Sequence, residues 1–418
     1  MKHIKIFAAL ALLLAASCSK DDNTVKISEI TLDKTSVKLT VGETYIIWAE
    51  IIPENATDQA LTWSSSNETV ATVSDAGKVT AVEIGNSVIT VASGTVKAVC
   101  SVTVEPDIYV GGYERNVIPV IWKNGKAKRL VYNYFEVRSV YVSGNDVYAA
   151  GDDSHIIRLW KNGEEQEFTN ETQYTYARSV YVSDGDVYIA GQRGESAVPN
   201  AATLWKNGVA KRISSANGND ACAFSVFVSG SDVYVAGNEW KTGFINYVAI
   251  LWKNGIAQNL TDGTKHANAL SVYVSGSDVY AGGYEKSAAN YGSPSIAKLW
   301  KNGAVQNLTD GTKDAIIRSV YVSDGDVYAA GYEKNEDGKR VAKLWKNGVA
   351  QNLTDGTKGA EVYSVCVFEG DVYASGYEEN DAGHFVAKLW KNGEEYELAI
   401  DDYTRSSVAY SVFVKRKD

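Results

Sequence analysis

The sequence predicts an all-β protein in which an N-terminal β-sandwich is followed by a seven-bladed β-propeller of four-stranded blades. Beyond residue 24 the chain consists of short alternating apolar and polar runs separated by Gly, Asn, Asp and Pro. A five-residue motif, LWKNG in most copies, occurs seven times at intervals of 38 to 48 residues. Alternating runs between such turns are typical of strands, and repeats of this length are typical of closed or stacked arrays.

The first residues are typical of a secretory signal that the mature protein lacks. Lys2, His3 and Lys5 precede the apolar run Ile6–Ala16, and small residues lie directly before Cys18. Removal of Lys2 and Lys5 from the 41 Lys and Arg leaves 39 basic residues against 51 acidic ones, a net charge of −12. Phosphate binding requires clustered positive charge, so we expect no nucleic-acid partner.

The stretch LAASC resembles the lipobox of bacterial lipoproteins, although Ala15 stands where the strictest form has Leu. The resemblance implies a lipoprotein signal peptide over residues 1–17, lipidation of Cys18 and a lipidated tether over residues 18–24. The following SKDD (Ser19–Asp22) resembles the surface-export tag of lipoproteins in the Bacteroidetes. We therefore expect an outer-membrane protein that is anchored by lipid and faces the cell exterior.

Residues 25–105 read as short strands between turns, which predicts a sandwich of fewer than a hundred residues. The stretches LDKTSVKLTVGE, LTWSSSNETVATVS, GKVTA and ITV resemble a bacterial immunoglobulin-like (Ig-like) group 2 domain. In that family such domains are mostly spacers or adhesive modules of cell surfaces, so the resemblance implies a stalk. We expect Trp48 and Trp63 to lie in its core.

Residues 107–418 contain the repeats, and one unit divides into four short strands. The strands read SVYVS, DVYAAGYE, VAKLWK and VAQNLT, with Gly-Ser or Asp-Gly between the first pair and Asn-Gly between the last pair. Asn-Gly and Asp-Gly predict tight hairpins. We expect a structural role for the repeated Trp and Asp: Trp122, Trp160, Trp205, Trp252, Trp300, Trp345 and Trp390, and Asp107, Asp146, Asp186, Asp232, Asp278, Asp326 and Asp371.

The order of the motifs predicts that the ring is closed by the chain's own end. The series begins at Asp107 with a second strand and finishes with a first strand, AYSVFV at Ala409–Val414. Pairing of the two would complete the first blade and remove exposed sheet edges. In this reading Trp fills the space between blades and Asn-Gly reverses the chain.

Cysteine and histidine usage gives no sign of metal or redox chemistry. Cys100, Cys222 and Cys366 lie in different segments without metal-type spacing, and an odd number argues against a disulfide framework. Cys366 replaces an aromatic residue of the repeat, so we expect a small buried hydrophobe. The sequence has no zinc spacing, calcium loop or G-x-S-x-G nucleophile, and we expect no metal, no cofactor and no catalytic residue.

The connections predict which face of the propeller carries function. Those between strands one and two and between three and four hardly vary, whereas those between two and three and between blades vary strongly. The residue before each SV is expected at the central channel mouth on the variable face. We predict ligand-binding residues at the mouth and in these loops: Arg138, Arg178, Arg318, Tyr363, Tyr410, Trp240, Tyr134 and Tyr176.

Two interpretations of these side chains remain open. Aromatic residues in loops stack on sugars or anchor proteins, and arginines clamp a carboxylate or a sulfate. Alternatively, the arginines pair with Glu136 and other nearby acids. Likewise, QNLTDGTK, repeated verbatim at Gln258, Gln306 and Gln351, indicates either duplication or several weak equivalent sites for a repeating polymer.

We favour a non-catalytic cell-surface lipoprotein whose propeller, carried on the Ig-like stalk, binds a glycan or a surface protein, as in adhesion. One alternative is a carbohydrate-active enzyme, a polysaccharide lyase or glycoside hydrolase, with its site at the channel mouth, since paired carboxylates cleave glycosidic bonds. Another is a structural scaffold, of which a broad apolar patch on the loop face would be the sign.

Overall fold

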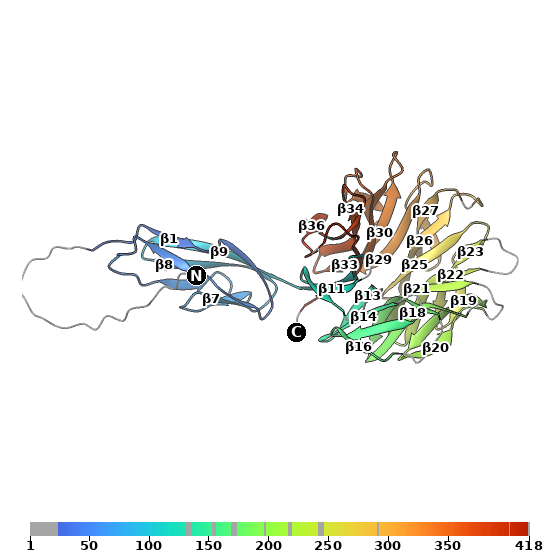
Figure 1. The fold of residues 1–418 in the computed structure, drawn as a ribbon, viewed down its shortest axis with the longest axis horizontal. Helices are drawn as coiled ribbons and strands as arrows, with labels where there is room; N and C mark the ends of the chain where they lie inside the picture. Colours follow the sequence, from blue (N-terminus) through green and yellow to red (C-terminus); the bar gives the residue numbers. More distant parts are fainter. Residues whose placement is uncertain are drawn as a thin grey trace, which may run out of the picture. The chain divides into compact units, whose positions relative to one another are not determined.

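The computed structural model describes residues 24–116, 118–130, 135–152, 156–168, 174–195, 198–215, 220–240, 246–290, 292–400 and 402–416. Their regular structure consists of β-strands (Figure 1). No helix in these ranges is long and apolar enough to cross a membrane. The chain divides into two compact units at Glu105/Pro106. Cys18 and the proposed signal lie outside the described residues, as does Tyr134.

The N-terminal unit is an Ig-like set of nine strands in three small sheets, with the orders β1-β4, β2-β9-β8-β5 and β3-β7-β6. Its core includes Val79, Ile89 and Cys100, none of which is exposed. The strands are β1 (Glu29–Leu32), β2 (Ser36–Thr40), β3 (Thr44–Ile46), β4 (Ala49–Ile52), β5 (Thr62–Ser65), β6 (Ala71–Val73), β7 (Lys78–Ala81), β8 (Gly85–Ser93) and β9 (Val96–Glu105).

The two tryptophans of this unit differ in their environment. Trp63 packs against the core, but Trp48 is 65% exposed, so the prediction that it is a core residue is wrong. The reason is its neighbour. Ile47 is buried, and successive side chains of extended backbone point to opposite sides. Trp48 is therefore directed outward, while its backbone N–H donates to Asp33 Oδ1 at 2.9 Å.

The C-terminal unit contains seven four-stranded antiparallel sheets, which confirms the predicted seven-bladed propeller. Blade 1 is β12-β11-β10-β37, and blades 2 to 7 follow as consecutive meanders from β13 to β36. The first strands of neighbouring blades contact each other around the ring. In blade order these inner strands are β37 (Val408–Lys415), β13 (Glu136–Ser143), β17 (Thr175–Ser183), β21 (Ala221–Ser229), β25 (Ala267–Ser275), β29 (Ala315–Ser323) and β33 (Ala360–Phe368).

The other strands of each blade follow in sequence toward the rim. The second strands are β10 (Asp107–Glu114), β14 (Asp146–Asp152), β18 (Asp186–Glu195), β22 (Asp232–Trp240), β26 (Asp278–Lys286), β30 (Asp326–Lys334) and β34 (Asp371–Glu379). The third strands are β11 (Ile118–Lys123), β15 (Ile157–Lys161), β19 (Val198–Lys206), β23 (Tyr247–Lys253), β27 (Ser295–Lys301), β31 (Arg340–Lys346) and β35 (Phe385–Lys391). The fourth strands are β12 (Lys126–Arg129), β16 (Glu164–Gln166), β20 (Val209–Arg212), β24 (Ile256–Asn259), β28 (Ala304–Asn307), β32 (Val349–Asn352) and β36 (Glu394–Tyr396).

Two sets of hydrogen bonds close the ring. β37 pairs with β10 from Asp107↔Lys415 to Tyr113↔Val408, so the C-terminal strand completes blade 1. In addition, the serine of each SV motif accepts the valine N–H of the next blade at 3.0–3.3 Å, all the way round. The acceptors are Ser139, Ser179, Ser225, Ser271, Ser319, Ser364 and Ser411.

Three residues of the motif LWKNG, the Trp, Lys and Asn, have a defined role, as blade 2 illustrates. Trp160 is buried among side chains of blades 1 and 2. Asn162 adopts positive φ, as a tight Asn-Gly turn requires, and its Nδ2 donates to Asp146 Oδ1 at 2.8 Å. Lys161 pairs with the other oxygen of Asp146 at 2.6 Å and lies over the Tyr148 ring. The same Asp–Asn–Lys lock recurs in all seven blades, with Asn–Asp distances of 2.8–2.9 Å and Lys–Asp distances of 2.6–2.9 Å.

The aromatic residues of the SVYV motifs pack around the propeller axis. Neighbouring ring centroids are 4.5–5.0 Å apart along a row of six: Phe413, Tyr141, Tyr181, Phe227, Tyr273 and Tyr321. Cys366 takes the seventh place and is a free, buried thiol, as predicted. Burial raises the pKa of the Cys366 thiol to about 12, so it is neutral at physiological pH.

Deletion of Arg405–Asp418 should abolish cooperative unfolding of the propeller. Without β37 the inner edge of β10 has no partner, and Ser364 and Ser411 no longer link blades 7, 1 and 2. Differential scanning calorimetry of the mature chain tests this. A deletion of only the two residues after Arg416 is the control. A sharp, unshifted transition in the long deletion would show that the ring does not need its closing strand.

Acid should destabilise the propeller because of the seven aspartate locks. The ion pair with Lys346, followed by the amide of Asn347, holds the pKa of Asp326 below its ordinary value. A carboxyl group whose pKa is lower in the folded state stabilises the fold above its unfolded pKa, about 3.9, and loses this contribution as pH falls further. We expect the melting temperature to fall between pH 5 and pH 3. The variant Asp326→Asn should have a lower melting temperature than wild type at pH 7, and its melting temperature should fall less between pH 5 and pH 3. The control Asp337→Asn, in an exposed loop, should behave like wild type in both respects. Equal pH profiles for all three proteins would contradict this.

Candidate functional site

A β-bulge in the inner strand of every blade positions the candidate site. The pairing of the first and second strands skips one residue in each of the seven blades. A bulge leaves the extra residue unpaired and redirects its side chain. The bulged residues are those before each SV motif, here called the mouth: Arg138, Arg178, Phe224, Leu270, Arg318, Tyr363 and Tyr410.

A glycine in the second strand makes each bulge possible. In blade 6, a Cβ on Gly331 would lie 1.9 Å from the carbonyl oxygen of Ile316, two residues before the bulged Arg318. The glycines of the other blades would meet the corresponding oxygen at 1.8–2.1 Å: Gly112, Gly151, Gly191, Gly237, Gly283 and Gly376. The final G of DVYAAG is the sequence signal for the bulge.

The mouth lies near the start of the inner strands, on the face of the variable connections. Antiparallel pairing puts the connections between strands one and two, and between three and four, on the opposite face. We call the variable side the loop face. It consists of the connections between strands two and three and the crossovers between blades.

Four mouth residues from adjacent blades form a continuous row. The guanidinium of Arg318 lies 5.6 Å from the ring centroid of Tyr363, and the Tyr363 and Tyr410 rings meet edge to face at 5.0 Å. Arg138 lies over the other end of the row, 4.5 Å from the Tyr410 ring. The row Arg318–Tyr363–Tyr410–Arg138 therefore runs across blades 6, 7, 1 and 2, and a second layer of aromatic residues, including Tyr377, packs behind it.

Two of the three mouth arginines are paired with acids. Arg138 pairs with Glu136. Arg318 donates to Glu361 at 2.6 Å, and Arg340 donates to the other oxygen of this fully buried carboxylate at 3.0 Å. The interpretation that mouth arginines bind nearby acids is thus correct for Arg138 and Arg318. Sequence reasoning identified neither Glu361 nor Arg340, which lie on different strands from Arg318.

Arg178 differs from the other two mouth arginines. It forms no ion pair with any residue within the described ranges, and its buried Nε, like that of Arg138, has no hydrogen-bond partner there. Its guanidinium acts on the thiol of Cys222, but burial is the larger effect and raises the pKa of that thiol to about 12. Asp220 and Asp152 act on the same thiol, so these two carboxylates lie near the Arg178 guanidinium.

The mouth tyrosines are neutral hydrogen-bonding groups. Burial is the main cause that raises the pKa of both Tyr363 and Tyr410, and the nearby Glu361 and Glu136 respectively act in the same direction. Both phenols therefore keep their protons at neutral pH. Each combines an aromatic surface with a protonated hydroxyl group, and the hydroxyl of Tyr410 is hydrogen-bonded to Glu136.

The remaining predicted residues do not join this row. Trp240 ends β22 and is 37% exposed; its ring meets Tyr247 edge to face at 5.3 Å, and Tyr247 meets His266 at 5.2 Å. Burial, and then the ammonium of Lys286, lowers the pKa of the His266 ring. Tyr176 is half-buried in β17, two residues before the mouth residue of blade 3. Trp240 thus belongs to a separate aromatic cluster on blades 4 and 5.

The verbatim DGTK turns are closed by their own side chains. In the second copy Asp310 Oδ1 accepts from the Thr312 N–H at 2.9 Å and from its hydroxyl at 2.7 Å. The other two copies repeat this geometry. Identical residues thus build identical turns. Among the side chains that the structure describes, no group of three or more His, Cys, Asp or Glu is placed to hold a metal ion.

Comparison with known proteins identifies the domain type of the N-terminal unit. The family model of the bacterial Ig-like domain (group 2) matches residues 26–104. An uncharacterised protein of Clostridium acetobutylicum is 38% identical over 73 residues, which cover 18% of this chain and 8% of that protein. An alpha-L-arabinofuranosidase of Bifidobacterium longum subsp. longum is 37% identical over 109 residues, which cover 25% of this chain and 10% of that protein.

The chain thus spans a tenth or less of the length of these two relatives. Among solved structures, the β-propeller domain of the trilobed protease from Pyrococcus furiosus is similar, with a TM-score of 0.39 and 10% identity over 79% of this chain and 99% of that one. The matched Ig-like family indicates a protein of the bacterial surface or exterior.

Replacement of Gly331 by Ala should destabilise the propeller by about 1–3 kcal/mol, the usual cost of forcing extra atoms into a packed site. The added methyl group would collide with the Ile316 carbonyl, and the bulge that carries Arg318 would have to shift. Urea unfolding measures the change. Gly292→Ala is the control, because its Cβ would meet only Asn290 Oδ1 at 3.5 Å. Equal stabilities of the two variants would argue against a role for the glycine in the bulge.

Proposed function

We propose that this chain is a surface lipoprotein, anchored through Cys18, whose propeller binds a glycan at the mouth without catalysis. The row Arg318–Tyr363–Tyr410–Arg138 is the observation that carries the proposal. It offers two neighbouring aromatic rings between two guanidinium groups, at the entrance of a rigid ring of strands. The Ig-like unit acts as the stalk that presents it.

The chemistry of the row suits a sugar better than an extended apolar partner. Tyrosine rings pack against the C–H faces of sugars, and their neutral hydroxyls donate to sugar oxygens. The carboxylates Glu136 and Glu361 hold Arg138 and Arg318 in place, so the row is preorganised and little side-chain entropy is lost on binding. Arg178, which forms no ion pair within the described ranges, favours a sugar that carries a carboxylate or a sulfate.

A second candidate function is glycoside cleavage, with Glu136 and Glu361 as the acid pair. It is motivated by the presence of two carboxylates behind the mouth and by the arabinofuranosidase that is similar to a quarter of this chain. Against it, both carboxylates face arginines, whereas a glycosidase needs one carboxyl group that gives up a proton to the leaving oxygen. Product analysis after prolonged incubation with a bound glycan separates the two functions, since a binding protein leaves it intact.

Arg178→Ala and Tyr410→Ala should each weaken glycan binding by about tenfold or more, which corresponds to about 1.4 kcal/mol. The first change removes a charged donor, and the second removes one ring of the row. A glycan array with the mature protein identifies ligands, and titration calorimetry measures the affinities. Lys126→Ala, at the start of the outer strand of blade 1, should bind as wild type does. Full binding by both mouth variants, with unchanged melting temperatures, would place the ligand elsewhere.

A further inference from the structure

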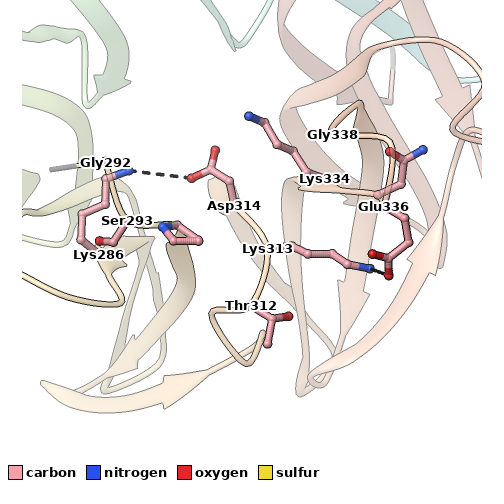
Figure 2. A pocket seen from close by; sticks show the side chains of 11 residues that line it. Lys286, Gly292, Ser293, Thr312, Lys313, Asp314, Lys334, Glu336 and Gly338 are labelled. Carbon is pink, nitrogen blue, oxygen red and sulfur yellow. Dashed lines mark ion pairs between the residues drawn. The ribbon is translucent and has the colours of Figure 1, made fainter. Parts of the chain in front are cut away.

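A cleft of about 500 Å³ opens on the loop face between blades 5 and 6 (Figure 2). Its walls are the connection between β26 and β27, the crossover that precedes β29, and the connection between β30 and β31. The cleft is distinct from the mouth, because no bulged residue lines it. Charged side chains from all three segments face it: Lys286, Lys313, Asp314, Lys334 and Glu336.

The charged side chains of the cleft differ in how closely they are paired with a group of opposite charge. Lys313 pairs with Glu336 at 2.6 Å, and Lys286 approaches Asp314 only to 3.9 Å. Lys334 forms no ion pair with any residue in the described part of the chain, and Figure 2 shows its amine extending away from the wall with no ion pair drawn to it. Three lysines against two acids give the cleft a net charge of +1 in a chain whose net charge is −10.

Both carboxylate oxygens of Asp314 accept hydrogen bonds from residues in the wall of the cleft. One carboxylate oxygen accepts the Ser295 N–H at 2.9 Å, and the other accepts the Tyr332 hydroxyl at 2.8 Å. These bonds hold blades 5 and 6 together, since Ser295 lies in β27 and Tyr332 in β30. The carboxylate is thus oriented by its own partners, and Lys334 remains available to a ligand.

The corresponding position of the next blade shows that the fold does not require this lysine. Lys334 and Glu379 both end the second strand of their blade, and both donate a backbone N–H to the crossover residue: Lys334 to the Asp314 oxygen at 2.9 Å and Glu379 to the Gly359 oxygen at 2.8 Å. The same backbone position thus carries a cation in blade 6 and an anion in blade 7. Blade 5 has Lys286 at this position, with its N–H donated to the His266 oxygen at 2.8 Å, so the strand end accepts side chains of either charge.

A chain of side chains connects the cleft to the mouth. The Tyr332 hydroxyl donates to Asp314. The Arg340 guanidinium lies over the ring of the same tyrosine, 4.8 Å from its centroid. Arg340 donates to Glu361, the carboxylate that also holds the mouth residue Arg318. The walls of the cleft and one end of the mouth row are therefore parts of one fixed network.

We infer that this cleft is an anion-binding subsite, in which the Lys334 ammonium binds a carboxylate or a sulfate carried by a glycan on the loop face. Lys286 and Lys313 add positive field around it, and Asp314 and Glu336 keep the walls in place. The inference rests on the proposed glycan-binding function and specifies the ligand class further: an acidic saccharide. The network between cleft and mouth fixes the two subsites relative to each other.

Titration calorimetry of the mature full chain tests the subsite with three probes: a galacturonic acid tetramer, a sulfated galactose tetramer and a neutral galactose tetramer. We expect Lys334→Glu to weaken binding of an acidic probe by about tenfold or more, in line with the loss of a charge-assisted hydrogen bond. Lys334→Gln should have an intermediate effect. Lys126→Glu, which changes the net charge equally, should have none, and binding of the neutral probe should not change in any variant. The acidic probe that responds distinguishes a carboxylate from a sulfate.

Two results would overturn the inference. If acidic probes bind and Lys334→Glu binds them as wild type does, the cleft is not the subsite, and the mouth variants decide the proposed function separately. If neither acidic probe binds the wild type although the array identifies a neutral glycan that the mouth variants lose, the ligand is not acidic and the proposed function stands without this subsite. Melting temperatures of Lys334→Glu and Lys334→Gln check that both variants are folded.

Discussion

The site depends on one close contact in each blade, between a glycine and a carbonyl oxygen. Because the glycine has no Cβ, the carbonyl oxygen of the inner strand can approach it closely. The residue two positions after that carbonyl is then left unpaired in the bulge, and its side chain is redirected. Without the bulge, successive side chains of the inner strand would point to opposite faces of the blade, and the side chain before SV would lie on one of those faces. The arginine and tyrosine row, its paired glutamates and the position of Arg178 all follow from this displacement. The repeated glycine is therefore as important to the proposed function as any residue that would contact a ligand.

The repeated stabilising contacts of the propeller lie at the short turns and within the blades, whereas the variable side chains lie on the loop face. At the conserved turns each blade has the same Asp–Asn–Lys lock, the same buried tryptophan and the same serine bond to its neighbour. These interactions involve residues of one blade or of two adjacent ones, so they are independent of the distant connections. The loop face is consequently free to differ: Glu361 is buried between two arginines, Trp240 packs on Tyr247, and Lys334 stands where blade 7 has Glu379.

The parts of the structure that could be predicted from sequence are those encoded within one repeat. The Asn-Gly turns and tryptophans specify the blade locally. The position before SV predicts a shared place at the mouth for Arg138, Arg318, Tyr363 and Tyr410, and these four side chains lie next to one another in a row; that they bind a ligand stays a prediction. The partners of that row could not be read in the same way. Glu361 and Arg340 meet Arg318 across a blade boundary, and nothing in their spacing marks the contact. Residue type alone predicts Trp48 as a core residue, whereas its exposure depends on the neighbouring Ile47, whose burial only the folded structure shows.

The direct continuation of β9 into β10 has a mechanical consequence. Only Pro106 separates the two strands, so tension on the Ig-like unit enters the propeller at Asp107. β10 is not an edge strand. It is hydrogen-bonded to β11 on one side and to β37 on the other. A load that enters at Asp107 therefore acts on two ladders of hydrogen bonds at once, one to the third strand of the blade and one to the strand that closes the ring.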